Sequence, residues 1–326
     1  MVDAPPSGET VQSKGSRTRA GIALAIAIIS ILGIIFAAKI YQDNQATKPV
    51  AISNPELPAN DSPECAELLD RLPDRAAGLV RADIAEPAPE GAAVYRNLEQ
   101  DRITLRCGAN VPSQYNELAK TEEVKGISWL RVVDSTDESL ATWFTVGREP
   151  VVAITAEGNA EAEDALSDLA EALRPDSAYK NKPERGGVPL VELAAPEADK
   201  RCSGLEAALP RELGNRHRLS AEEMPADMPK DMVIWGGTPA DPVVLRCGVD
   251  EPAGYSTTTQ QLTQVGDIVW FNEPTLSSGT SATWYAMGRE RFVAVEMPMS
   301  EASSLMPVLS SVIADNLENI SPSEEK

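Results

Sequence analysis

The chain has 326 residues, with 50 aspartate and glutamate residues against 29 lysine and arginine residues, and its formal net charge is −21. This length allows two domains, and such an acidic surface repels phosphate backbones, which argues against nucleic-acid binding. The only histidine is His217, so histidine-rich metal sites and most histidine-assisted nucleophiles are excluded. Because His217 lies beside two arginines in a polar segment, we expect it at the surface.

The first predicted element is an apolar helix over residues 20–38. This stretch holds 19 uncharged residues, about the length that crosses a hydrocarbon core of roughly 30 Å. The alternative is a cleaved signal peptide, but such peptides have apolar cores of about 7 to 15 residues and small residues before the cleavage site. Here Ile35 or Phe36 would occupy a small-residue position. The sequence therefore favours an uncleaved transmembrane helix.

The charges before this helix predict its orientation. Lys14, Arg17 and Arg19 precede it, and an excess of basic residues marks the cytoplasmic side. We therefore expect a single-pass protein of the cell membrane, with a cytoplasmic tail over residues 1–19 and the bulk of the chain extracytoplasmic. Residues 39–61 are expected to form a linker, since residues 42–63 hold four prolines, and to keep the folded part away from the bilayer as a semi-extended tether.

The rest of the chain contains an internal repeat. Leu-Arg-Cys-Gly at 105–108 recurs at 245–248, in both places followed by a proline and a tyrosine at the same spacing. Ala-Thr-Trp with a following Gly-Arg-Glu, at 141–149, recurs as the same residues at 282–290. A fixed period of this kind indicates a duplicated structural unit.

These matches set the predicted domains. The first extracytoplasmic repeat is expected over residues 62–174 and the second over 199–319, with a short tail at 320–326. Residues 175–198 between them hold four prolines and a Gly-Gly pair, which is typical of a linker.

Each repeat shows the same order of predicted elements, namely a short helix, four or five mostly antiparallel strands and an amphipathic helix. This predicts an α+β fold with a sheet packed against helices. In the first repeat the predicted helices are 66–72 and 162–173, and the strands are 93–95, 103–107, 127–133, 140–146 and 151–155. In the second the helices are 203–209 and 302–317, and the strands are 233–235, 243–247, 267–271, 280–287 and 291–296.

Four cysteines without CxxC spacing, in an exported chain, indicate disulfides and not a zinc site or a redox pair. Three connectivities are possible. Each repeat carries one early and one central cysteine, so the economical pairing joins Cys65 to Cys107 and Cys202 to Cys247. Strand alternation turns these cysteines inward and the adjacent arginines outward.

The repeated charged residues are the candidate ligand-binding residues. They are Arg106, Arg148, Glu149, Arg246, Arg289 and Glu290. The favoured interpretation is structural, with each arginine paired to carboxylates on an acidic surface. The alternative is that exposed guanidinium groups bind a carboxylate or phosphate ligand, which they contact with two parallel donors.

The anchored N-terminus, the two-cysteine unit, the Leu-Arg-Cys-Gly strand with its proline and tyrosine, and the Ala-Thr-Trp hairpin resemble an actinobacterial family of membrane-anchored secreted domains of unknown function. The resemblance implies an envelope location and no established activity. Members of that family carry one such unit, so the duplication in this chain is a departure.

Motifs that would mark an enzyme are absent from the sequence. It has no GxxxxGK, GxSxG, HExxH or DxDxDG pattern, so we expect no cofactor and no metal site. The predicted function is a non-enzymatic binding module for an envelope protein or a cell-wall component. The alternatives are a structural spacer or accessory subunit of an envelope complex, and a hydrolase that uses two carboxylates.

Overall fold

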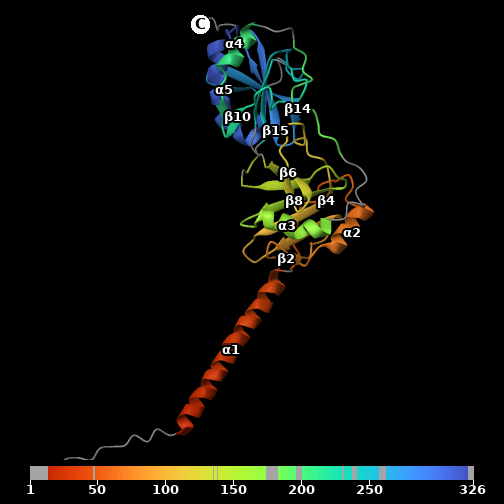
Figure 1. Ribbon diagram of the computed structural model, residues 1–326, viewed down its shortest axis with the longest axis vertical. Helices are drawn as coiled ribbons and strands as arrows, with labels where there is room; N and C mark the ends of the chain where they lie inside the picture. The colour runs from red at the N-terminus through yellow and green to blue at the C-terminus, as the bar shows by residue number, and fades with distance from the viewer. Residues whose placement is uncertain are drawn as a thin grey trace, which may run out of the picture.

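The computed structural model describes residues 14–46, 48–134, 136–137, 139–173, 183–195, 200–229, 231–236, 241–256 and 262–321. Figure 1 shows a long helix followed by two folded units that lie in line along the longest axis of the molecule. Each unit has one antiparallel eight-stranded sheet with helices. The α+β fold class and the duplication are therefore confirmed.

The N-terminal helix, α1 (Lys14–Ala46), has 33 residues. Its most apolar stretch, Leu24–Gln42, has a mean hydropathy of 2.4 and is not buried against the rest of the protein. This stretch begins and ends four residues later than the predicted one, because the helix continues through Lys39 into Ile40 and Tyr41. Its large apolar side chains are exposed, which suits a helix whose surroundings are lipid.

The first repeat begins with a short helix and ends with a longer one. Its sheet has the order β1-β2-β3-β4-β8-β7-β6-β5. The elements are α2 (Pro63–Arg71), β1 (Arg75–Ala76), β2 (Leu79–Ala82), β3 (Ala92–Arg96), β4 (Arg102–Ala109), β5 (Glu122–Val124), β6 (Ile127–Val133), β7 (Ala141–Thr145), β8 (Val151–Glu157) and α3 (Ala162–Leu173).

The second repeat has the same strand order, β13-β14-β15-β16-β12-β11-β10-β9 when it is read from the opposite edge. Its elements are α4 (Lys200–Ala208), β9 (Glu212–Leu213), β10 (Arg216–Arg218), β11 (Met232–Gly236), β12 (Val243–Val249), β13 (Leu262–Val265), β14 (Ile268–Ser278), β15 (Ser281–Met287), β16 (Phe292–Pro298), the 3-10 turn η2 (Met299–Glu301) and α5 (Ala302–Asn316).

The sequence underestimated the number of strands. Each sheet has eight strands where four or five were predicted, because the unpredicted strands β1, β2, β5, β9, β10 and β13 have only two to four residues and are too short to show alternation. Helix α5 contains Pro307 in its second turn. This proline is exposed there, so its missing N–H faces the solvent side of the helix.

The main core of each repeat lies between the sheet and its two helices. In the second repeat Cys247, Leu245 and Val243 on β12 pack with Leu309 and Ile313 of α5. The first repeat is built in the same way from the alternate residues of β4 and the apolar face of α3. The predicted inward direction of the cysteines therefore agrees with the structure.

The segment before each repeat packs on the sheet and is not a free tether. The Val50 N–H donates to the Asp83 carbonyl at 2.9 Å, and the Ala85 N–H donates to the Val50 carbonyl at 2.9 Å. In the second repeat Val188 and Leu190 are buried with residues of β11, β12 and β15. Within residues 48–62, part of the expected semi-extended tether, Val50, Ser53 and Ala59 are thus hydrogen-bonded to the first repeat.

The two repeats contact each other head to tail. The Gln114 side chain, which follows β4, donates to the Thr280 hydroxyl at 2.7 Å, and Thr280 lies in the β14–β15 turn. The counterpart of Gln114 in the second repeat is Gly254, so the contact joins non-equivalent positions of the two copies. One end of the second repeat thus rests on the opposite end of the first.

Candidate functional site

The arginine of the repeated Leu-Arg-Cys-Gly strand binds the segment that precedes its own repeat. Arg246 is buried, and its Nη1 donates to the carbonyls of Leu190, Val191 and Leu193 at 2.9, 3.0 and 2.5 Å. Its Nε donates to the Asp231 carboxylate at 2.8 Å. The guanidinium does point away from the disulfide, but the linker covers it.

Arg106 has the equivalent role in the first repeat. Its Nη2 donates to the Ser53 carbonyl at 3.0 Å and to the Ser53 hydroxyl at 2.9 Å. Burial lowers the pKa of this guanidinium, and nearby Arg102 lowers it further. Arg106 and Arg246 thus hold each preceding segment on the outer face of its sheet, mainly through contacts with backbone carbonyls.

The arginines of the hairpin turns bind the C-terminal ends of the packing helices. Arg148 Nη2 donates to the Leu173 carbonyl at 2.7 Å, and Arg289 Nη1 donates to the Leu317 carbonyl at 3.1 Å. Both arginines are buried. A cation at the last carbonyls of a helix satisfies acceptors that lack a partner within the helix, and it interacts favourably with the helix dipole. These two buried arginines thus bind backbone carbonyls, whereas the sequence suggested surface carboxylates as their partners.

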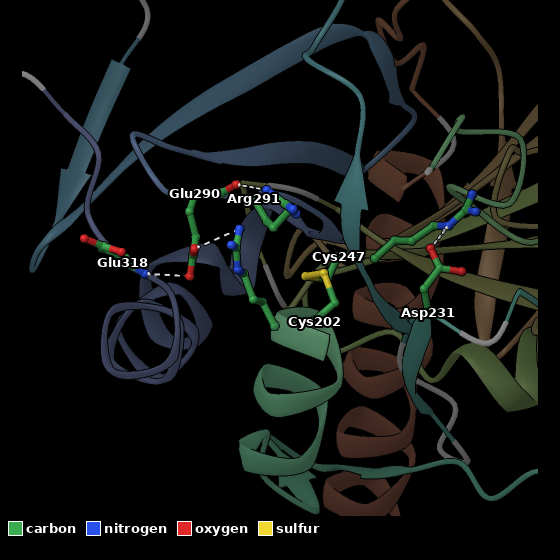
Figure 2. Close-up of a disulfide and its surroundings, with 8 residues drawn as sticks. Cys202, Asp231, Cys247, Glu290, Arg291 and Glu318 are labelled. Carbon is green, nitrogen blue, oxygen red and sulfur yellow. Dashed lines mark hydrogen bonds and ion pairs between the residues drawn. A yellow bond between two sulfur atoms is a disulfide. The ribbon is translucent and has the colours of Figure 1, made fainter. Parts of the chain in front are cut away.

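The two glutamates that follow these arginines differ. Glu290 forms an ion pair with Arg201 at 3.1 Å and accepts a hydrogen bond from the Glu318 N–H at 3.2 Å (Figure 2). Glu149, its counterpart, is exposed and lines a cavity of about 450 Å³ with residues 58–64 and 108–111. The paired ligand site that the repetition suggested is thus not formed by these glutamates.

Both predicted disulfides are present. Cys65 is bonded to Cys107, and Cys202 to Cys247, with Cα atoms 5.6 Å apart in each pair. Figure 2 shows the second one where α4 meets β12. Each bond ties the opening helix of a repeat to its central strand. Disulfides of this kind form and persist in oxidising compartments.

One concave feature lies between the two repeats. A cavity of about 460 Å³ is lined by residues of the first repeat, of the connecting segment and of the second repeat. The lining residues are 117–121, Arg185, Leu219, Glu223, Pro225, Gly236 and Pro242. We refer to this feature as the inter-repeat cleft.

Arg185 is held in place at one wall of the inter-repeat cleft. Its Nη1 donates to the carbonyls of Asn116 and Ala119 at 3.2 and 2.8 Å, and its guanidinium carbon lies 5.2 Å from the centre of the Tyr115 ring. Such stacking fixes the plane of the guanidinium. A rigid cation therefore borders the cleft.

A carboxylate of the second repeat also lines the cleft. Glu223 accepts a hydrogen bond from the Ser220 N–H at 2.9 Å and lies 3.0 Å from His217 Nε2. These two contacts, that of Ser220 first, hold the pKa of Glu223 at about 2. The side chain of His217 is about half exposed, as predicted. The lining of the cleft thus includes a positive group from the connecting segment and a negative group from the second repeat.

Two partly buried acids lie near the contact between the repeats. Burial raises the pKa of Asp241 to about 6 and that of Glu296 to about 7, and the Asp241 charge raises the latter further. The Thr280 hydroxyl lies 3.5 Å from Asp241, and the Thr283 hydroxyl 3.5 Å from Glu296. Neither acid lines the inter-repeat cleft. Within the described ranges, no group of three histidine, cysteine, aspartate or glutamate residues could hold a metal ion.

Comparison with known families decides how the chain is classified. One family model matches residues 24–183 and again 176–321, and its description is "protein of unknown function (DUF3515)". The chain belongs to the DUF3515 family. It carries two tandem DUF3515 units, in agreement with the duplication. No curated protein and no solved structure matches the chain.

Sequence reasoning missed the residues of the inter-repeat cleft and the acid pair. Arg185 lies in residues 175–198, which the sequence predicts to be a linker. It belongs to no repeated motif, so the sequence gives no sign that it has a structural role. Glu296, in contrast, stands out in the sequence. It is an acid within an apolar strand, and the equivalent residue of the first DUF3515 unit is Thr155, which instead lies 2.8 Å from the Thr142 hydroxyl.

Proposed function

We propose that this DUF3515 protein is a membrane-anchored extracytoplasmic binding module of the cell envelope, and that the inter-repeat cleft holds an extended segment of a partner polypeptide. The role is non-enzymatic. An actinobacterial envelope remains the location that the sequence resemblance suggests.

The anchor and its orientation are supported by three features. Helix α1 exposes its apolar side chains along the whole candidate span. Basic residues precede the span, which favours a cytoplasmic N-terminus. Two disulfides lie beyond it, and such bonds persist in oxidising compartments.

The binding role rests on one observation, the cleft to which both repeats and the connecting segment contribute. Its walls combine a stacked arginine, a permanently ionised glutamate and the apolar side chains of Leu118 and Leu219. Polypeptide segments carry both charged groups and apolar side chains, so this lining suits a peptide better than a purely apolar or purely anionic ligand. The repeated arginines are bound to carbonyls, which leaves the cleft as the better candidate.

Site-specific photocrosslinking in cells tests this proposal. A benzophenone amino acid replaces Lys120, an exposed residue that lines the cleft. The matched control replaces Lys200, which is exposed at the start of α4 and does not line the cleft. We expect a polypeptide adduct at position 120 only, and its loss when Leu219→Arg fills the cleft while the melting temperature is retained. Equal adducts at both positions, or none, would favour the spacer interpretation.

A second candidate function is hydrolysis by two carboxylates. The raised pKa values of Asp241 and Glu296 favour it, because a carboxyl that stays protonated near neutral pH can act as a general acid. If this is correct, Glu296→Gln should abolish turnover of an envelope substrate by the full chain without changing its melting temperature at pH 5.

A further inference from the structure

The chain between α1 and the first repeat is short. The candidate span ends at Gln42, the helix ends at Ala46, and Val50 is already hydrogen-bonded to Asp83 and Ala85. At about 1.5 Å per helical residue and at most about 3.5 Å per extended residue, Val50 lies no more than about 20 Å from the end of the span.

This distance is small beside the dimensions of the bilayer and of the repeat. The headgroup region adds roughly 5 to 8 Å on each side of the hydrocarbon core, and a compact unit of about 100 residues has a radius of gyration of about 13 Å. The part of the first repeat that holds Val50 therefore lies within about 15 Å of the headgroups, a distance of the same order as this radius.

The cavity beside Val50 identifies this part of the first repeat. Val50 lines a cavity of about 290 Å³ together with Arg96, Gln100, Asp101, Arg102 and Glu157. These residues belong to the β3–β4 turn and to the strand ends next to it. Helix α1 contacts β2, the neighbouring strand, and enters the first repeat at this end (Figure 1). We call it the proximal end.

An apolar side chain lies at the tip of the proximal end. Leu98, in the β3–β4 turn, is 43% exposed. An aliphatic side chain at a membrane surface gains free energy by entering the interface.

Charged groups of both signs lie at the proximal end. Glu157 is paired with Arg102. The Asp101 carboxylate accepts hydrogen bonds from the Asn97 side chain and the Asn159 N–H, each at 2.8 Å. The other charged groups there include Lys48, Arg96 and Glu99, and Asp134 and Asp137 of the β6–β7 turn. The three basic groups offset part of the acidic charge at this end.

The equivalent end of the second repeat contacts the first repeat. Gly236 and Pro242 are the counterparts of Arg96 and Arg102, and they line the inter-repeat cleft, where the second repeat rests on the first. The same end of the DUF3515 unit is thus a contact surface in the second copy. In the first copy the element that precedes this end is α1 and not another repeat.

We infer that the proximal end of the first repeat rests on the phospholipid headgroup layer, with Leu98 inserted into the interface. This inference depends on the membrane anchor of the proposed function and is independent of the inter-repeat cleft. It makes the first repeat a membrane-contacting unit, and the second repeat the unit that lies farther out.

Fluorescence quenching in vesicles tests the inference with the full chain. The chain is reconstituted into phosphatidylcholine vesicles that contain a lipid with a nitroxide on its headgroup. A single environment-sensitive fluorophore is attached to Leu98→Cys. Leu262→Cys is the matched control, because Leu262 is also 43% exposed but lies on the edge strand β13 of the second repeat. We expect a loss of emission at position 98 and unchanged emission at position 262.

The outcomes separate this inference from the anchor. If the chain floats with the vesicles and emission at position 98 is retained as at position 262, the inference is overturned and the anchor stands. If the chain does not float with vesicles after a high-salt wash, the anchor itself fails, and the inference fails with it. Equal loss of emission at both positions would also overturn it, because the second repeat would then lie as close to the lipid.

Discussion

Trp270 donates its indole N–H to the Ser310 hydroxyl at 2.9 Å across the core of the second repeat. The equivalent tryptophan of the first repeat, Trp129, is fully buried, and its Nε1 has no hydrogen-bond partner among the described residues. The position equivalent to Ser310 is Ala170, which packs in the same core as Trp129. The two cores thus differ in one hydrogen bond because of a single hydroxyl group.

Ala170→Ser should supply the missing acceptor and raise the free energy of unfolding of the first repeat by about 1 kcal/mol, since a buried donor gains a partner. The converse change, Ser310→Ala, should lower that of the second repeat by about 1 to 3 kcal/mol, because it leaves the Trp270 N–H unpaired. Hydrogen exchange of α3 and α5 in the full chain measures both effects. Ala165→Ser, on the same helix, is the control and should not stabilise.

Arg289→Gln should lower the free energy of unfolding of the second repeat by about 2 to 3 kcal/mol. Arg289 is buried and donates to the carbonyls of Leu317 and Asp267 at 3.1 and 2.7 Å, and these acceptors would lose a charged donor. Thermal unfolding of the wild-type and variant chains measures the loss. Arg211→Gln, which replaces an exposed arginine, should change the stability by less than about 0.5 kcal/mol. Equal effects of the two variants would contradict the structural role of Arg289.

A fragment that begins at residue 183 should be more stable than one that begins at residue 196. Val188 and Leu190 are buried in the second repeat, and Arg246 binds the carbonyls of this segment. Burial of the two side chains corresponds to about 3 kcal/mol or more. Urea denaturation of both fragments, each ending at residue 326 and expressed in an oxidising compartment, gives the difference. Equal stability would show that the segment adds nothing to the fold of the second repeat.

The stability of the second repeat should decrease as the pH rises from about 4 to 7. The pKa of Glu296 is about 7 and that of Asp241 about 6, both because of burial, whereas the unfolded values are near 4. The folded state therefore binds protons more tightly in this window, and its stability is greatest below pH 4 as far as these two acids are concerned. Other titratable groups also change the stability with pH. The contribution of these two acids is therefore measured by comparing the wild-type chain with a variant.

Glu296→Gln should flatten this dependence and raise the free energy of unfolding at pH 8 by on the order of 1 to 2 kcal/mol. Denaturation curves of the full chain at pH 4 to 8 measure it. The charged groups near the acid pair, Arg131, Arg216 and Glu301, are retained in the variant. Glu222→Gln, which removes an exposed carboxylate, should leave the slope unchanged. If the Glu296→Gln variant keeps the wild-type change of unfolding free energy with pH, groups other than Glu296 cause that change.

The repetition and the alternation of apolar residues were sufficient to predict the duplicated α+β fold, the inward cysteines and their pairing. These features follow from local periodicity, and each copy offers a check on the other. The environment of the arginines could not be predicted in this way. Alternation indicates that Arg246 faces away from the cysteine side of its strand, but it does not reveal that residues 188–194 cover that face.

The contact between the repeats could also not be predicted from the sequence. The hydrogen bond between Gln114 and Thr280 joins two loops that have no common pattern. The repeated tryptophans also differ in burial. Trp129 and Trp270 are fully buried in the core, whereas Trp143 and Trp284 on the neighbouring strands are only half-buried.

The head-to-tail arrangement also has a consequence for symmetry. Gln114 and Thr280 are not equivalent positions, so the contact is heterologous, and a heterologous contact that does not form a ring is open-ended. A twofold contact would bury the same surface on both copies and leave no equivalent surface free for a further copy. The second copy repeats the proline and the tyrosine of the receiving loop as Pro252 and Tyr255, but it has Gly254 in place of Gln114. A third unit added by duplication beyond the second would therefore meet a loop without the side chain that makes the present hydrogen bond.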